Sequence, residues 1–238
     1  MVILAIETST KVCSAAVVAD GQVVAECMDR ESGNHARQLP LFIDKLLRET
    51  QQKGLKLDAV ALSEGPGSYT GLRIGTSTAK GLCYGLDIPL IPIPTTEVLC
   101  AAVNCQLSTV NCQLLPLIDA RRMEVYTALY TSDIQPLTPI QAVIVDDKSV
   151  FCQRSGLCSV SEAVCFFGDG AAKCREILES EQWHFVPDIV PKAACMGKLA
   201  EAKMKAGKAC KTTNEVAYYE PFYLKEFVAA KSHIKGLE

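Results

Sequence analysis

The stretch Glu64–Gly75 constrains the fold of this chain more than any other part of it. It follows the apolar run Asp58–Ser63, which we expect to form a buried strand. Its Gly-Pro-Gly sequence predicts a tight turn, and Ile74–Tyr84, which contains no proline, is expected to be helical. The stretch therefore predicts a strand, a turn and a helix N-terminus, where free amides and the helix dipole favour an anion.

This turn has two alternative roles. Ser68 or Thr70 can cap the amides of the first helical turn, and with Gly67 they form a candidate anion site. Alternatively, the glycines serve only the backbone angles of a tight turn.

The helix after the turn is unusually rich in glycine. Gly71, Gly75, Gly81 and Gly85 lie in or near it, and each glycine inside a helix costs about 1 kcal/mol relative to alanine. A surface almost bare of side chains lets another backbone approach closely, which would offset this cost. The neighbour is either the chain's own sheet or a helix of a partner protein, and we favour the partner.

Composition excludes several classes of protein. The chain has 238 residues, 49% hydrophobic and 21% charged, which is typical of one large or two small folded domains. Its net charge of −3 argues against a free-standing nucleic-acid binder. Val98–Ile118 lacks charged residues, but its many polar side chains argue against a membrane span.

The 12 cysteines form no recognisable metal or disulfide pattern. No CxxC motif occurs, so a zinc site is not expected. The first residues have no basic segment and soon reach Glu7, so we expect no secretory signal, a cytoplasmic location and reduced cysteines.

Several segments resemble the bacterial TsaB (YeaZ) family. Glu64–Arg73 is similar to its GPGSFTGLR signature, and Ile3–Thr10, His35–Pro40 and Asp119–Tyr126 match in the same order. The resemblance implies an α/β, two-lobed ASKHA fold, that of actin, sugar kinases and heat-shock chaperones, with mixed sheets flanked by helices. We expect one lobe at 1–105 and another at 106–238, with a helix near 192–205 packing back on the first lobe.

The resemblance also implies a function. It indicates a non-catalytic accessory subunit that binds and activates a TsaD-type transferase in the N6-threonylcarbamoyladenosine modification of tRNA. A TsaE-type ATPase is expected as a further partner, with tRNA contacted only through the complex and no membrane association. No catalytic residue, metal or cofactor of its own is expected. The resemblance does not decide whether ATP or ADP binds near the shared interface, or whether the free chain is a homodimer.

Two helices are candidates for the partner interface. The first, Leu39–Gln52, has apolar residues at helical spacing opposite charged ones, a pattern that more often marks a core than an interface. The second is the glycine-rich helix. The candidate interface residues are Leu39, Phe42, Ile43 and Leu46 on the first helix, and Gly71, Gly75, Thr78 and Leu82 on the second.

A loop near the N-terminus departs from the ASKHA pattern. The superfamily normally presents Asp-x-Gly-Thr to nucleotide phosphates, whereas this chain has Glu7-Thr8-Ser9-Thr10, without the glycine that lets backbone approach phosphate. This departure argues against ATP catalysis. A strand, Gly168-Asp169-Gly170 and a helix could bound a nucleotide pocket. The candidate nucleotide or anion residues are Thr8, Ser9, Thr10, Gly67, Ser68, Gly168, Asp169 and Gly170.

Two enzyme classes are alternatives. A metallopeptidase would need the His-x-x-x-His pair of TsaD-like proteins, but Leu39 stands four residues after His35. A stand-alone nucleotide-binding kinase would need a phosphate-binding glycine, and Thr8-Ser9 stands in its place.

Overall fold

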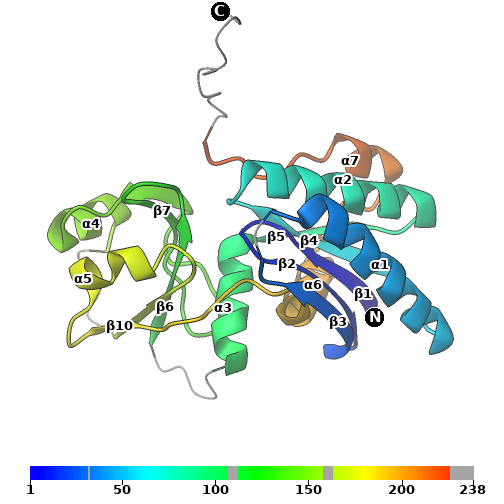
Figure 1. Ribbon diagram of the computed structural model, residues 1–238, viewed down its shortest axis with the longest axis horizontal. Coiled ribbons are helices and arrows are strands. Elements are labelled where there is room, and N and C mark those ends of the chain that lie inside the picture. The colour runs from blue at the N-terminus through cyan, green and yellow to red at the C-terminus, as the bar shows by residue number, and fades with distance from the viewer. Residues whose placement is uncertain (32, 107–111, 158–162, 226–238) are drawn as a thin grey trace, which may run out of the picture.

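A computed structural model describes residues 1–31, 33–106, 112–157 and 163–225. They form two lobes side by side, each built on a five-stranded sheet (Figure 1). The two-lobed α/β architecture with mixed sheets agrees with the expected fold class. Among these residues, no helix is both long and apolar enough to cross a membrane.

The sheet of the first lobe has the strand order β3-β2-β1-β4-β5. Its first three strands form an antiparallel meander, in which Asp20 and Gly21 take the positive φ angles of a tight hairpin. β4 and β5 then add in parallel beside β1. The strands are β1 (Val2–Glu7), β2 (Cys13–Ala19), β3 (Gln22–Asp29), β4 (Ala59–Gly65) and β5 (Leu90–Pro94).

Helices cover both faces of this sheet. Leu4 and Ile6 of β1 pack with the helices of one face, whereas Ile3 and Ala5 pack with those of the other. Because both faces are buried, β1 is a continuous apolar run rather than an alternating one. One face carries α1 (His35–Gln52) and α2 (Tyr69–Leu86), and the other carries α3 (Thr95–Gln106), η2 (Ala193–Met196) and α6 (Gly197–Lys205).

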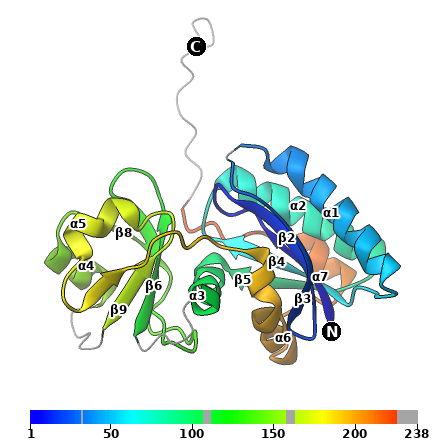
Figure 2. The ribbon, with the colours of Figure 1, turned by 60° about the horizontal axis from the view of Figure 1, so that its bottom comes forward.

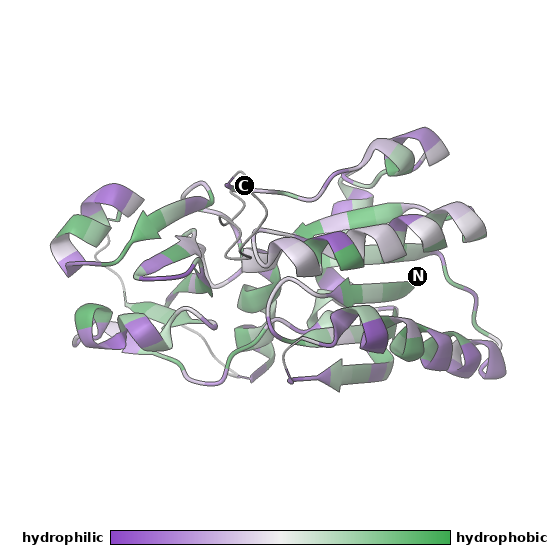
Figure 3. Cartoon of the chain, turned by 45° about the horizontal axis from the view of Figure 1, so that its top comes forward, coloured by the Kyte–Doolittle hydropathy of each residue, from purple (hydrophilic) through white to green (hydrophobic). Residues whose placement is uncertain are grey.

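Helix α1 begins at His35, as expected soon after that residue, and Pro40 lies within its first two turns. Its hydrophobic and hydrophilic residues alternate along the helix (Figure 3), and Leu39, Ile43 and Leu46 face the sheet whereas Leu41 is exposed. The amphipathic pattern at 39–52 therefore marks a helix that covers the core of its own lobe.

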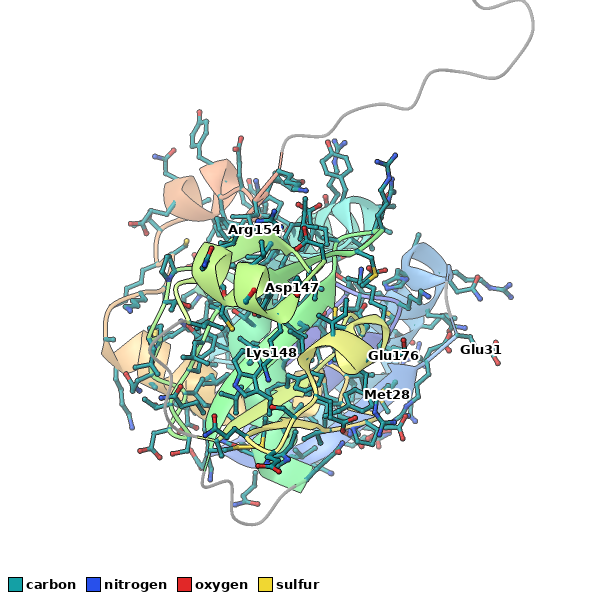
Figure 4. All side chains as sticks on the ribbon, turned by 90° about the vertical axis from the view of Figure 1, so that its left-hand side faces the viewer. Met28, Glu31, Asp147, Lys148, Arg154 and Glu176 are labelled. Atoms are coloured by element: carbon teal, nitrogen blue, oxygen red, sulfur yellow. A yellow bond between two sulfur atoms is a disulfide. The ribbon has the colours of Figure 1, made fainter. Side chains whose placement is uncertain are left out.

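The second lobe is smaller, with strand order β10-β9-β6-β7-β8. Phe151, Phe166 and Trp183 lie in its core. Figure 4 views this end of the molecule, where the Asp147 carboxylate caps α4 by accepting hydrogen bonds from the backbone of Ser149 and Val150. The elements are β6 (Gln113–Asp119), β7 (Glu124–Thr127), β8 (Gln141–Ile144), α4 (Lys148–Ser155), β9 (Val164–Phe167), η1 (Ala172–Cys174), α5 (Arg175–Leu178) and β10 (Trp183–Phe185).

The chain does not stay in the second lobe to its end. After β10 it returns to the first lobe, where η2 and α6 pack on the sheet and α7 (Thr213–Tyr218) packs against α2. The expected boundary of 106–238 therefore describes the second sheet only as far as β10. The helix expected after Gly168-Asp169-Gly170 is short, because the chain leaves α5 in extended conformation at Glu179 and Trp183 enters the core.

A disulfide joins Cys112 and Cys165. β6 and β9 are neighbouring parallel strands in which Gln113 pairs with Val164, so the two cysteines come within 6.2 Å between Cα atoms. The expectation that the cysteines are reduced is wrong for this pair. The sequence gives no sign of it, because pairing across a sheet depends on register.

Candidate functional site

A cleft of about 780 Å³ lies between the two lobes. The β1–β2 loop, the turn before α2 and the first turn of α2 line it from the first lobe. The β6–β7 loop and Asp169 line it from the second lobe, and 222–225 line it from the C-terminal segment. Of the eight expected nucleotide or anion residues, Ser9, Thr10, Gly67, Ser68 and Asp169 line the cleft.

The turn before α2 packs tightly on the β1–β2 loop. The Thr8 hydroxyl donates to the Gly71 carbonyl at 2.8 Å, and the Ser68 amide donates to the Ser9 carbonyl at 2.6 Å. A Cβ atom at Gly67 would lie 2.2 Å from the Ser9 carbonyl oxygen. The glycine is therefore needed because two loops of the same chain are in contact.

The same explanation holds for the first two glycines of α2. A Cβ atom at Gly71 would lie 2.0 Å from the Thr8 carbonyl oxygen, and one at Gly75 would lie 2.3 Å from the Thr8 Oγ1 atom. The close neighbour is thus the chain's own β1–β2 loop. The prediction that a partner helix lies against Gly71 and Gly75 is wrong.

The expected interface residues on α1 are also largely internal. Leu39, Ile43 and Leu46 are buried in the core between the helices and the sheet, and only Phe42 is partly exposed. These three are therefore no longer candidate interface residues, because the apolar stripe of α1 covers the sheet of its own lobe. Thr78 and Leu82 of α2 are partly exposed.

Helix α2 begins at Tyr69, five residues before the expected helix Ile74–Tyr84. Of the two expected capping residues, Ser68 is the N-cap, and its Oγ atom accepts a hydrogen bond from the Gly71 amide at 3.3 Å. Thr70, the other candidate, is exposed and lines the cleft.

Glu7 lies beneath the β1–β2 loop. It is fully buried, and its Oε1 atom accepts hydrogen bonds from the Ser9 amide at 2.6 Å and the Ser9 hydroxyl at 2.5 Å. Burial raises the pKa of the Glu7 carboxyl, which the hydroxyls of Ser63 and Ser9 partly oppose. Among the described residues Glu7 is not part of the cleft lining, so its carboxyl supports the loop from behind.

Glu7 should make stability depend on pH. Its pKa is raised from 4.5, so the folded state retains a proton that the unfolded state loses. The stabilising contribution is therefore complete below the unfolded pKa and is lost as pH rises through the folded pKa. Glu7→Gln removes this dependence. We therefore expect the melting temperature of Glu7→Gln, relative to that of the native protein, to rise between pH 4.5 and neutral pH.

The control is Glu31→Gln, at an exposed position, whose difference from the native protein should stay flat over the same range. If the difference in melting temperature between Glu7→Gln and the native protein also did not change with pH, Glu7 would ionise in the folded state as it does in the unfolded state.

Two aspartates stand together on the second-lobe wall. The Asp119 amide donates to the Asp169 carboxylate at 3.0 Å, and Lys173 pairs with the Asp119 carboxylate. Loss of solvent raises the pKa of Asp169, the hydrogen bond from the Asp119 amide partly opposes this, and the Asp119 charge adds a smaller increase. Gly168 and Gly170 pack against β6, where a Cβ atom at Gly168 would lie 2.5 Å from the Leu117 carbonyl oxygen. Of the three expected residues here, only Asp169 reaches the cleft.

Sequence reasoning missed the part played by the C-terminal segment 219–225. The Phe222 amide donates to the Glu64 carbonyl at 2.8 Å, and the rings of Tyr223 and Tyr69 lie 5.0 Å apart. Lys225 forms an ion pair with Glu124 of the second lobe. The segment therefore runs along the cleft from one lobe to the other. Its three aromatic residues are one signal in the sequence, and the resemblance of Pro221–Lys225 to the PxYLR segment that closes TsaB-family sequences is another.

Lys80 of α2 holds the start of this segment. Its Nζ atom donates to the carbonyls of Ala217 at 2.6 Å and Tyr219 at 3.0 Å. We expect Lys80→Met to lower the free energy of unfolding by about 1–2 kcal/mol, since it removes two charge-assisted hydrogen bonds. Amide exchange in Thr213–Tyr218 should accelerate first. Lys45→Met is the control, because Lys45 forms a surface pair with Glu49. Equal amide exchange of Thr213–Tyr218 in both variants would contradict the role given to Lys80.

The His35 imidazole is occupied by a local contact. Its Nε2 atom lies 2.9 Å from the Thr10 carbonyl oxygen, and Leu39 is buried. Within the part of the chain that the structure describes, no three His, Cys, Asp or Glu side chains are grouped closely enough to hold a metal.

Known proteins resemble this chain in both sequence and fold. The family model for TsaD, tRNA N6-adenosine threonylcarbamoyltransferase, matches residues 29–232. The tRNA threonylcarbamoyladenosine biosynthesis protein TsaB of Bacillus subtilis is 33% identical over 150 residues, 62% of this chain and 64% of the relative. TsaB of Escherichia coli is 36% identical over 135 residues, 56% of each protein. The matched part thus spans less than two thirds of either relative.

The fold agrees with these matches. The solved structure of YeaZ from Pseudomonas aeruginosa superposes with a TM-score of 0.78 at 21% identity, covering 94% of this chain and 99% of that protein. Family model, relatives and fold agree with the resemblance seen in the sequence. The chain belongs to the TsaD domain family, and within it the chain is similar in sequence to TsaB proteins.

Proposed function

We propose that this chain is a non-catalytic accessory subunit that binds and activates a TsaD-type threonylcarbamoyl transferase acting on tRNA adenosine next to the anticodon. The names of its relatives support a place in threonylcarbamoyladenosine biosynthesis. A TsaE-type ATPase is a proposed further partner. ATP or ADP is proposed at or near the surface shared with the transferase, as the family resemblance implies.

The second pair of glycines in α2 carries the docking part of this proposal. A Cβ atom at Gly81 or Gly85 would meet nothing within 4 Å, so contacts inside the described chain do not explain them. Each costs about 1 kcal/mol of helix stability relative to alanine. Thr78, Gly81, Leu82 and Gly85 follow the spacing i, i+3, i+4, i+7 and form one stripe, which we call the α2 stripe. The close approach of a partner's backbone would explain why Gly81 and Gly85 lack side chains.

Reconstitution tests the proposal. Purified TsaD-type and TsaE-type subunits, the enzyme that supplies threonylcarbamoyl adenylate, ATP and unmodified tRNA are incubated with and without this chain. We expect threonylcarbamoyladenosine, measured by mass spectrometry of digested tRNA, only when both this chain and the transferase are present. Equal modification without this chain would overturn the accessory role. Modification by this chain without the transferase would overturn the assignment as non-catalytic.

A further inference from the structure

The described chain leaves the first lobe at the end of α3 and returns to it at η2, and a cysteine lies at each of these two points. The first passage leaves α3 after Gln106 and enters β6 at Gln113. The second leaves β10 at Phe185 and enters η2 at Ala193, running past α3 on the way to α6 (Figure 2). Cys105 lies at the end of α3 and Cys195 lies in η2.

These two cysteines face each other. Helix α3 packs against η2, and the Cys105 thiol is a hydrogen-bonding neighbour of the Cys195 thiol. Both are free thiols, Cys105 exposed and Cys195 partly buried at the edge of a cluster of α3, β6 and Ile189. The Ala193 amide donates to the Ser14 hydroxyl at 3.0 Å, so η2 is anchored on the first sheet. Neither cysteine takes part in the cleft or in the α2 stripe.

We propose that Cys105 and Cys195 form an oxidisable pair, closed by a low-molecular-weight disulfide into a bond that joins these two interlobe passages. The Cys105 thiolate attacks the small disulfide, so a mixed disulfide forms and one small thiolate leaves. Cys195 gives its proton to solvent and attacks the Cys105 sulfur, which releases the second small thiolate. Two protein thiols are oxidised and one small disulfide is reduced to two thiols.

The surroundings set the order of these two steps. Burial, together with the neighbouring Cys105, raises the pKa of Cys195 to about 12, and the nearby Lys192 and Glu26 act in opposite directions. Cys195 is therefore a neutral thiol near pH 7, while Cys105 is exposed to solvent and to reagents. Cys105 thus reacts first with the small disulfide, and Cys195 resolves the mixed disulfide. The closed bond would hold the end of α3 against η2 and restrict hinge motion between the lobes.

The test maps the disulfide bonds of the whole chain. Reduced and desalted protein is incubated with oxidised glutathione, free thiols are blocked with N-ethylmaleimide, and a tryptic digest is analysed without reduction. Cys195 is the only cysteine of peptide 193–198, and Cys105 lies in peptide 81–121. We expect these two peptides to be linked, and the linkage to disappear in Cys105→Ser and in Cys195→Ser. A link between 81–121 and 155–173 reports Cys112–Cys165 and serves as an internal marker.

The control is Cys27→Ser, since Cys27 is equally a free, partly buried cysteine, on β3. It should leave the link between the two peptides unchanged. Oxidation should also raise the melting temperature of native and Cys27→Ser protein, reversibly with dithiothreitol, by more than that of Cys105→Ser, in which only the Cys112–Cys165 bond re-forms. A persistent glutathione adduct on Cys105 with Cys195 still free would overturn the proposal, as would a link that survives Cys105→Ser.

Discussion

Gly71→Ala is expected to lower the free energy of unfolding by about 2–3 kcal/mol, although alanine is the better helix former. The added methyl group would lie 2.0 Å from the Thr8 carbonyl oxygen, so the loop or the helix must move. The movement also weakens the hydrogen bond that the Thr8 hydroxyl donates to the Gly71 carbonyl. These costs exceed the gain of about 1 kcal/mol in helix propensity. Urea-induced unfolding measures the difference.

Gly81→Ala, the same substitution about one and a half turns before the end of α2, should change the free energy of unfolding in the opposite direction. At Gly81 the methyl group meets nothing within 4 Å, so Gly81→Ala should stabilise the chain by up to about 1 kcal/mol. The pair therefore compares one chemical change in one helix with and without a backbone neighbour. If Gly71→Ala were as stable as Gly81→Ala, the contact between α2 and the β1–β2 loop would not be the reason for the glycine.

Much of the first lobe could be predicted from its sequence because its signals are local. The apolar run before the turn, the Asp20–Gly21 hairpin and the amphipathic pattern of α1 each depend on residues close together in the chain. The resemblance of Glu64–Arg73 to a family signature then supplied the two-lobed fold. The N-cap of α2 was narrowed to Ser68 or Thr70, since a cap needs only the next three residues, and the structure shows that it is Ser68.

The parts that could not be predicted depend on contacts between distant segments. The sequence shows that Gly71 and Gly75 are costly in a helix, but it does not show that Thr8 is what lies against them. The path of 219–225 along the cleft is fixed by Glu64 and Glu124, far away in the chain. In the second lobe, β8, α4 and β10 are short, and so few residues give little periodicity to detect.

Gly81→Leu is expected to leave the chain folded and to weaken its association with the TsaD-type subunit by about a hundredfold, or about 3 kcal/mol. The side chain enters open space in the free protein, because no atom lies within 4 Å of the Cβ position. On the proposed docking surface the same side chain would hold two helices apart and disturb the whole α2 stripe. Titration by calorimetry and thermal unfolding on one preparation give the two quantities.

Ala202→Leu is the matched control, because it adds a leucine at an exposed position of α6, on the opposite face of the sheet. It should bind the partner like the native chain. Native affinity in Gly81→Leu, with Ala202→Leu also native, would exclude the α2 stripe as the docking surface and leave the cost of Gly81 and Gly85 unexplained. Reduced affinity in Gly81→Leu alone, at an unchanged melting temperature, would place the partner on the stripe. It would also divide the four glycines into two pairs, one that accommodates the chain's own loop and one that accommodates another protein.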